Sequence, residues 1–164
     1  MYDGKYSMQT LRPLTSDDIA MIAAWPAYPS EFSELDYALR ENGWLAEYSR
    51  KADTWLFALE DGGDLQAFTI LSKTADTAAE FRIALRADCI GKGLGHISTA
   101  LTLRKGLNEL GLSQIHLIVR KNNPRAARLY RSLGFIETGE CRKTINAKPV
   151  AFLEMRLSKQ AASD

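Results

Sequence analysis

Residues 85–95 read Leu-Arg-Ala-Asp-Cys-Ile-Gly-Lys-Gly-Leu-Gly and connect a strand-like segment to a helical segment that begins at His96. The three glycines stand at alternate positions, where they let the backbone approach a ligand that side chains would keep away. A helix that starts directly after such a loop offers unpaired N–H groups and the positive end of its dipole. These features favour a seat for phosphate or pyrophosphate between Gly91 and His96. A tight strand-to-helix turn without a ligand is the structural alternative.

Two phosphate-binding patterns fit this segment poorly. The P-loop needs Gly-Lys-Ser/Thr after a four-residue spacing, whereas Lys92 stands between two glycines and no such triplet follows. The dinucleotide pattern Gly-x-Gly-x-x-Gly meets His96 or Ser98 where its third glycine belongs. It also needs an acidic residue at the end of the next strand, but residues 114–121 end in Arg120-Lys121. An NADP-binding variant stays open as an alternative.

A second segment, residues 123–135, reads Asn-Pro-Arg-Ala-Ala-Arg-Leu-Tyr-Arg-Ser-Leu-Gly-Phe and predicts a short helix. Asn123 is a good N-cap, and Pro124 suits the first helical position, where no N–H is needed. One face of this helix carries Ala126, Leu129, Tyr130 and Leu133. Core packing explains the other three better than Tyr130, because a buried tyrosine needs a partner for its hydroxyl.

Both segments resemble the GNAT superfamily of acyl-CoA-dependent N-acetyltransferases. Residues 90–95 resemble its motif A, Arg/Gln-x-x-Gly-x-Gly/Ala, except that Ile90 takes the first position. Residues 123–135 match the family segment Asn-x-x-Ala-x-x-Leu-Tyr-x-x-x-Gly-Phe at every fixed position. The resemblance covers about residues 55–157.

The resemblance implies an α/β (mixed α+β) GNAT fold, with a central mixed, mostly antiparallel sheet of about seven strands and helices on both faces. It implies transfer of the acetyl group of acetyl-CoA to a primary amine of a small molecule or a peptide, by direct attack in a ternary complex. A regulatory module that binds acyl-CoA without turnover is the alternative from another class.

The resemblance also assigns the cofactor-binding residues. The pantetheine arm would run as an added strand beside Ile83, Ala84 and Leu85. A backbone N–H near Leu85 would polarise the thioester carbonyl. The pyrophosphate would bind at Gly91, Lys92, Gly93, Leu94, Gly95 and His96. The second segment would contact the cofactor through Asn123, Ala126 and Tyr130.

Two catalytic residues are expected. Tyr130 occupies the family's general-acid position and would protonate the leaving thiolate, since a thiol has a pKa of about 8.5 and a tyrosine about 10. One branch of the family carries its basic Glu five places before the motif Asn, but this chain has Ile118 there. Glu80 is the best substitute as general base and Glu60 a weaker one. A solvated carboxylate at the end of a strand is the alternative reading of Glu80.

The acceptor site is expected between the first two strands, in a region rich in aromatic and acidic residues. Trp25, Tyr28 and Glu31 are the candidates for binding the substrate, because aromatic rings beside carboxylates suit a cationic amine. Core packing and a solvated helix face explain the same composition.

The whole chain has 164 residues and a formal net charge of +1, which predicts a single domain over residues 1–164, with 160–164 as a frayed tail. The sequence has no basic stripe of the kind that would predict nucleic-acid binding. No apolar run is long enough to predict a membrane span, and the first residues do not resemble a signal peptide. The cytoplasm is therefore expected. Dimers are frequent in the family, so the resemblance also allows a homodimer.

Cysteine and histidine usage agrees with a reducing compartment and no metal. Cys89 and Cys141 lack Cys-x-x-Cys spacing and are expected as free thiols. His96 and His116 have no ligand-like neighbours. Periodicity predicts strands over 8–14, 53–60, 65–72, 80–85, 114–120, 135–141 and 149–157, and helices over 16–25, 32–48, 96–110 and 123–133.

Overall fold

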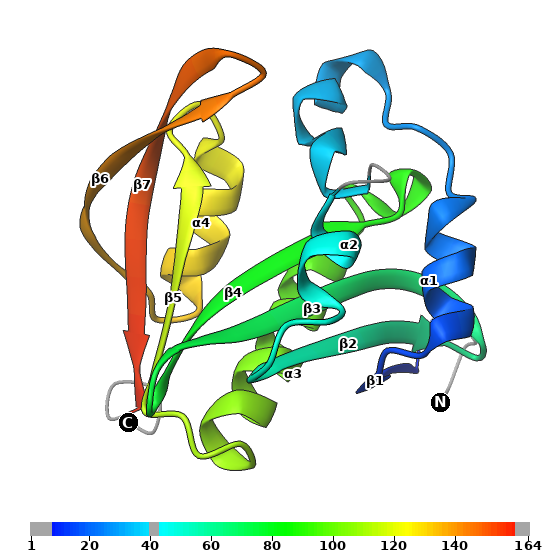
Figure 1. Ribbon diagram of the computed structural model, residues 1–164, viewed down its shortest axis with the longest axis horizontal. Coiled ribbons are helices and arrows are strands. Elements are labelled where there is room, and N and C mark those ends of the chain that lie inside the picture. The colour runs from blue at the N-terminus through cyan, green and yellow to red at the C-terminus, as the bar shows by residue number, and fades with distance from the viewer. Residues whose placement is uncertain (1–7, 40–42, 160–164) are drawn as a thin grey trace, which may run out of the picture. The chain divides into compact units, whose positions relative to one another are not determined.

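The computed structural model describes residues 8–39 and 43–159, and seven strands of this part form one sheet (Figure 1). The strands are β1 (Gln9–Pro13), β2 (Thr54–Asp61), β3 (Asp64–Ala75), β4 (Ala78–Leu85), β5 (Gln114–Arg120), β6 (Ile136–Ile145) and β7 (Lys148–Ser158). Their order across the sheet is β1-β2-β3-β4-β5-β7-β6. β4 and β5 are parallel, whereas β1 with β2, β2 with β3, β5 with β7 and β6 with β7 are antiparallel. The mixed, mostly antiparallel sheet that the sequence predicts is confirmed.

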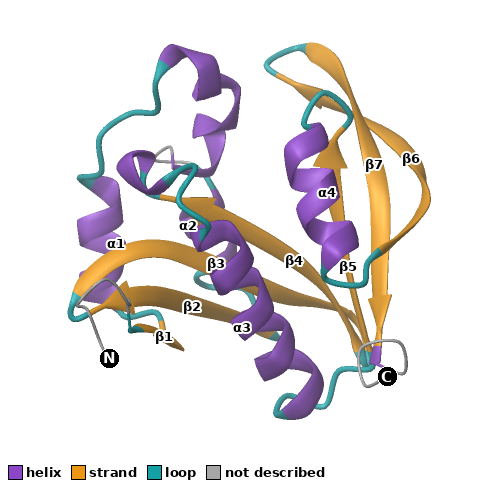
Figure 2. Cartoon of the chain, turned by 180° about the vertical axis from the view of Figure 1, so that it is seen from behind, coloured by secondary structure: helices purple, strands orange, loops and turns teal. Residues whose placement is uncertain are grey.

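The helical segments are shown in Figure 2. They are α1 (Ser16–Ala23), η1 (Ser30–Leu39), α2 (Trp44–Tyr48), η2 (Ala87–Cys89), α3 (Leu94–Asn108) and α4 (Pro124–Ser132), where η marks a 3₁₀-helix. The chain divides into two compact units, Met1–Ser72 with Arg82–Thr102, and Lys73–Phe81 with Leu103–Asp164. A single domain over residues 1–164 stays a prediction, and the predicted tail, 160–164, lies outside the described residues.

The core of the first unit lies on both faces of the sheet. One cluster joins Phe68 of β3 with Ile22 of α1 and Tyr48 of α2. A second cluster joins Ala67 of β3 with Leu94 at the start of α3. Adjacent residues of a strand point to opposite faces. Therefore α1 and α2 cover one face of these strands and α3 covers the other (Figures 1 and 2).

The helical region predicted over residues 32–48 is not one helix. The structure has η1, a 3₁₀-helix, and then the short helix α2. Gly43 is the N-cap of α2 and has an extended backbone, with φ −87° and ψ −151°, so a continuous helix cannot pass through it. The first helix is confirmed but ends at Ala23, because the N–H of Ala24 turns to the carbonyl of Met21 in a tighter turn.

α3 begins two residues before the predicted start at His96. Gly93 has a positive φ of 80° and ends the preceding loop. The Leu94 side chain is 6% exposed. Its burial offsets the low helix propensity of Gly95, which therefore lies inside the first turn rather than in the loop.

The second unit is built on the hairpin of β6 and β7. The turn of this hairpin consists of Asn146 and Ala147, with φ of 53° and 64°. Two successive left-handed residues are typical of a type I′ hairpin turn. β6 therefore extends to Ile145, four residues beyond the end predicted at Cys141.

α4 follows its predicted pattern closely. Asn123 is the N-cap, and its Oδ1 accepts a hydrogen bond from the Ala126 N–H at 3.2 Å. Pro124 is the first helical residue. Gly134 follows the helix with a φ of 104°. The helix lies along β5 (Figure 2).

Candidate functional site

The glycine loop, residues 90–93, leads from η2 into α3. Gly91 and Gly93 have positive φ values of 83° and 80°, a conformation that costs other residues strain. A Cβ on Gly93 would meet no atom within 4 Å, so its backbone conformation rather than lack of space calls for glycine. Gly91, Lys92 and Gly93 are exposed. This backbone and the first turn of α3, whose N–H groups lack partners within the helix, form a surface suited to a phosphate.

The loop is anchored by apolar side chains at both ends. Cys89, directly before it, is buried with Leu59 and Ala67, and Leu94, directly after it, belongs to the same cluster. Burial raises the pKa of the Cys89 thiol, which stays protonated and has little character as a nucleophile. Cys89 and Cys141 are both free thiols, as the sequence predicts.

The end of β4 carries the residues predicted for the pantetheine arm. The register of β4 with β5 runs from Ala78↔Gln114 to Glu80↔His116, and β4 continues to Leu85. Ala84 and Leu85 pack into the two clusters on opposite faces of the sheet. Their N–H and C=O groups therefore lie in the plane of the sheet, the direction that an added strand uses.

Tyr28 reaches the same strand end. Its hydroxyl donates to the carbonyl of Leu85 at 2.7 Å, although the sequence assigned it to the acceptor. Trp25, a second acceptor candidate, packs against Phe68 at 6.3 Å between ring centroids, within the core cluster. Glu31, the third, is exposed on η1. The structure therefore places these three residues in different surroundings.

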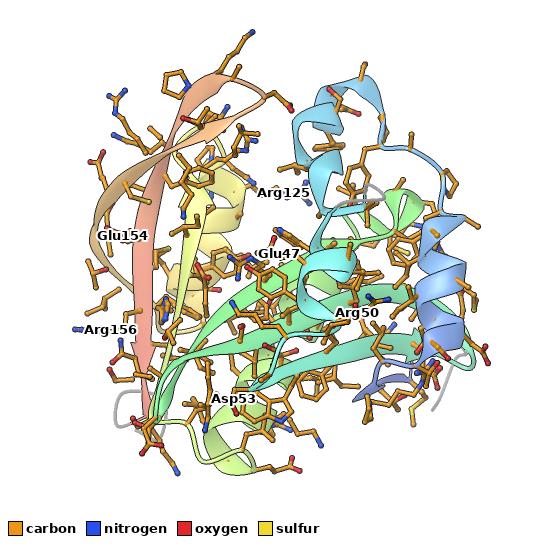
Figure 3. The ribbon with its side chains drawn as sticks, viewed as in Figure 1. Glu47, Arg50, Asp53, Arg125, Glu154 and Arg156 are labelled. Carbon is orange, nitrogen blue, oxygen red and sulfur yellow. The ribbon has the colours of Figure 1, made fainter. Side chains whose placement is uncertain are left out.

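The aromatic rings of α2 are covered by cations of this chain. The guanidinium of Arg82 lies 5.9 Å from the ring centre of Trp44 and 4.5 Å from that of Tyr48. Lys51 lies 5.2 Å from the Tyr48 ring centre. These distances fit cation–π contact. Glu47 on α2, which is labelled in Figure 3, is exposed.

Tyr130 lies in the second unit, in an aromatic environment. Its ring packs edge-on against Phe81 at 6.4 Å and against Phe135 at 5.8 Å. Burial raises the pKa of its hydroxyl above the ordinary tyrosine value, so the group stays protonated over the whole neutral range. Within the described part of the chain, no hydrogen bond to this hydroxyl is seen.

Glu80, His116 and Glu154 share one face of the sheet. Glu80 is half-buried and pairs in register with His116, whose Nε2 lies 2.8 Å from the Thr74 hydroxyl. Ile118 lies directly opposite Glu154 of β7, so both point to the same face. Glu154 is labelled in Figure 3.

Sequence reasoning missed Glu154. Desolvation raises the pKa of the Cys141 thiol, and the charges of Glu154 and Glu80 raise it further, so both carboxylates lie near that thiol. The strand register that brings them to one face could not be deduced from residue spacing, because β7 is the last strand in sequence but joins β5.

The described residues contain neither a cluster suited to a metal ion nor a membrane-spanning helix. There, no group of three or more His, Cys, Asp or Glu side chains is arranged to hold a metal ion. No helix of residues 8–39 and 43–159 has the length and apolar character needed to cross a membrane.

The chain is similar to known acetyltransferases in sequence and in fold. The Acetyltransferase (GNAT) family model matches residues 19–135, and the chain belongs to this family. A chimera of the spermidine N-acetyltransferase SpeG from Vibrio cholerae and hSSAT superposes with a TM-score of 0.77 at 25% identity, covering 96% of this chain and 100% of that one.

Two curated relatives match over shorter stretches. The spermidine N(1)-acetyltransferase of Escherichia coli K12 is 40% identical over 62 residues, which are 38% of this chain and 33% of the relative. The [ribosomal protein bS18]-alanine N-acetyltransferase of the same strain is 36% identical over 81 residues, 49% of this chain and 54% of the relative. The matches thus span about a third and about half of the lengths of these relatives.

Proposed function

We propose that this protein is an N-acetyltransferase that transfers the acetyl group of acetyl-CoA to a primary amine, by direct attack in a ternary complex. The observation that carries this proposal is the exposed loop with two left-handed glycines at the start of α3. Membership of the GNAT family supports it, as do the names of the relatives, which acetylate spermidine or the alanine of a ribosomal protein.

Binding of acetyl-CoA would use both motifs. Gly91 to His96 would hold the pyrophosphate through backbone N–H groups, with the exposed charge of Lys92 beside them. Ile83 to Leu85 would pair with the pantetheine arm. Asn123 would contact this arm through its amide N–H groups, since its Oδ1 caps α4. Ala126 would line the path in the first turn of the helix.

The reaction needs one proton removed from the amine and one supplied to the leaving sulfur. The amine nitrogen attacks the carbonyl carbon of the thioester, the carbon–sulfur bond breaks, and the sulfur takes a proton from the Tyr130 hydroxyl. Burial keeps the Tyr130 hydroxyl protonated at neutral pH, although its raised pKa also makes it a weaker acid toward the thiolate. A backbone N–H near Leu85 would stabilise the negative charge that develops on the carbonyl oxygen.

The base that deprotonates the amine has two candidates. Glu80 is the residue expected from the sequence, and Glu154 is the carboxylate opposite Ile118. Glu80→Gln and Glu154→Gln form a matched pair, each removing a charge at constant size. The variant of the true base should lower kcat/KM at pH 7 and lose the acidic limb of the pH profile, while the other should keep that limb.

The acceptor is proposed as a polyamine or a peptide amine. An α-amino group, with a pKa near 8, is about one-tenth neutral at pH 7, whereas a lysine-like amine needs far more help from a base. A panel of spermidine, alanine-starting peptides and lysine peptides therefore separates the two classes. The free thiols support a reducing compartment, so the cytoplasm is proposed as the location, and a homodimer stays a prediction.

Thermal unfolding with CoA, acetyl-CoA and NADPH tests the cofactor. A ligand at about 100 times its Kd adds about 2.7 kcal/mol of stability, a readable rise in Tm. A rise with both CoA species and none with NADPH is expected. A rise with NADPH alone would favour the dinucleotide alternative. Binding of acetyl-CoA without turnover on the amine panel would favour a regulatory module.

A further inference from the structure

Arg86, which follows β4 directly, joins three segments of the first unit. Its Nη1 donates to Asp64 Oδ1 at 2.7 Å and to the carbonyl of Leu65 at 2.8 Å, at the start of β3. Its Nε donates to Asp88 Oδ1 at 2.6 Å, within η2. The Nη2 group reaches the second oxygens of both carboxylates at 3.2 Å each. One guanidinium therefore clamps η2 to the beginning of β3.

The main chain of Arg86 strengthens this clamp. Its N–H donates to the carbonyl of Gln66 at 2.9 Å, and its carbonyl accepts from the N–H of Cys89 at 2.8 Å. The side chain is only 19% exposed. Single exposed ion pairs contribute little, but a planar guanidinium that holds two carboxylates and a carbonyl has a fixed geometry. Hydrogen bonds from Arg86 lower the pKa of Asp64 and Asp88, so the network persists in mild acid.

The clamp determines where the glycine loop begins. Between the buried residues Cys89 and Leu94 only the four residues 90–93 are left. Two of these are glycines in left-handed conformations, so the segment has little intrinsic stiffness. Its shape is therefore set by the positions of η2 and α3 at its ends. Arg86 fixes the η2 end.

We propose that Arg86 is a positioning residue for the acyl donor, holding the glycine loop in the shape that binds the pyrophosphate of acetyl-CoA. The inference rests on the proposed function. Arg86 acts through the loop, with its own charge neutralised by Asp64 and Asp88. Its loss therefore affects binding of the donor and leaves the amine and the chemical step unchanged.

Titration with CoA and steady-state kinetics test the proposal. Arg86→Ala is expected to raise the Kd for CoA and the KM for acetyl-CoA about tenfold, because a loop displaced by about 1 Å loses several hydrogen bonds to phosphate. The kcat at saturating acetyl-CoA and the KM for the amine should stay within about twofold. Arg86→Lys should fall between, since one ammonium cannot hold both carboxylates in fork geometry. Asp88→Asn, at an exposed side chain, is the milder variant that keeps the fold.

Arg12 provides the matched control in the same unit. It binds Asp18 through two hydrogen bonds of 2.6 and 2.8 Å and Glu60 through one of 3.0 Å, so Arg12→Ala also breaks an arginine network. This variant should lose stability and bind CoA like the wild type. Unchanged CoA binding in both Arg86→Ala and Asp88→Asn would overturn the proposal, and so would equal weakening by Arg12→Ala. Failure of the wild type to bind CoA would instead reject the proposed function, and the inference with it.

Discussion

The hydroxyl of Tyr28 donates a hydrogen bond of 2.7 Å to the main-chain carbonyl of Leu85. Tyr28 belongs to the segment between α1 and η1, in the region expected to shape the acceptor site, and Leu85 is the last residue of β4. The contact links the acceptor region to the strand end that would polarise the thioester. We therefore expect Tyr28 to act on the donor side of the reaction by holding the end of β4.

Tyr28→Phe removes this hydrogen bond and keeps the ring. We expect a loss of about 1 kcal/mol in the free energy of unfolding, the usual cost of one hydrogen bond. A several-fold lower kcat should accompany it, because the backbone of Leu85 is less well fixed. Chemical denaturation and steady-state kinetics measure both effects. A variant with wild-type kcat would contradict the link between this contact and the reaction.

Tyr130→Phe separates catalysis from packing. The rings of Phe81 and Phe135 keep their partner, so CoA affinity and stability should stay close to the wild type, while kcat falls about 10²-fold for lack of a general acid. CoA titration and the pH dependence of kcat are the measurements. Unchanged turnover between pH 7 and 9 would show that another group protonates the thiolate.

Gly93→Ala tests the loop conformation. With φ at 80° and no atom within 4 Å of the new methyl group, the substitution introduces backbone strain and no clash. We expect about 1 kcal/mol of lost stability and weaker CoA binding. Gly111→Ala is the control, because this glycine has φ 76° and equal space beyond the other end of α3. Its CoA affinity should not change, and a parallel loss in both variants would argue against a specific role for Gly93.

The loss of folding stability at acid pH should depend on Asp18. Arg12 lowers the pKa of this buried carboxyl from 3.8 to about 2. A carboxyl whose pKa is lowered by folding stabilises the folded state at every pH above the pKa of the unfolded state. That stability is lost as pH falls from near 4 through 2. Asp18→Asn should therefore cost about 2 kcal/mol at pH 7 and flatten the pH dependence of unfolding between pH 4 and 2. A steep limb that persists in the variant would assign acid sensitivity to other carboxyls.

The sequence predicted the parts of the fold that rest on local chemistry. Asn123 and Pro124 predict the start of α4, and the structure confirms Asn123 as the N-cap. The start of α3 was misplaced because burial of Leu94, a tertiary effect, draws Gly95 into the helix. Gly43 interrupts the helical region over 32–48 through its backbone angles, which periodicity does not report.

The candidate site, too, could be predicted only where it depends on residues that are close in sequence. The glycine loop is visible in the sequence as a run of residues, whereas the left-handed conformations of Gly91 and Gly93 are a finding of the structure. The contacts of Tyr28 and Arg86 join residues 57 and 22 positions apart, so residue spacing could not reveal them. Trp25 was a candidate because of its aromatic ring, but it packs against the core cluster. Composition alone does not distinguish a tryptophan that packs on the core from one that binds a substrate.

The most direct test of the central claim is to incubate the protein with acetyl-CoA and the amine panel and to detect acetylated product by mass spectrometry alongside released CoA thiol. We predict equal amounts of acetylated amine and free CoA with at least one primary amine, and a much lower yield with Tyr130→Phe. Tight acetyl-CoA binding with no acetylated product from any amine would contradict the account and leave a binding module on this fold.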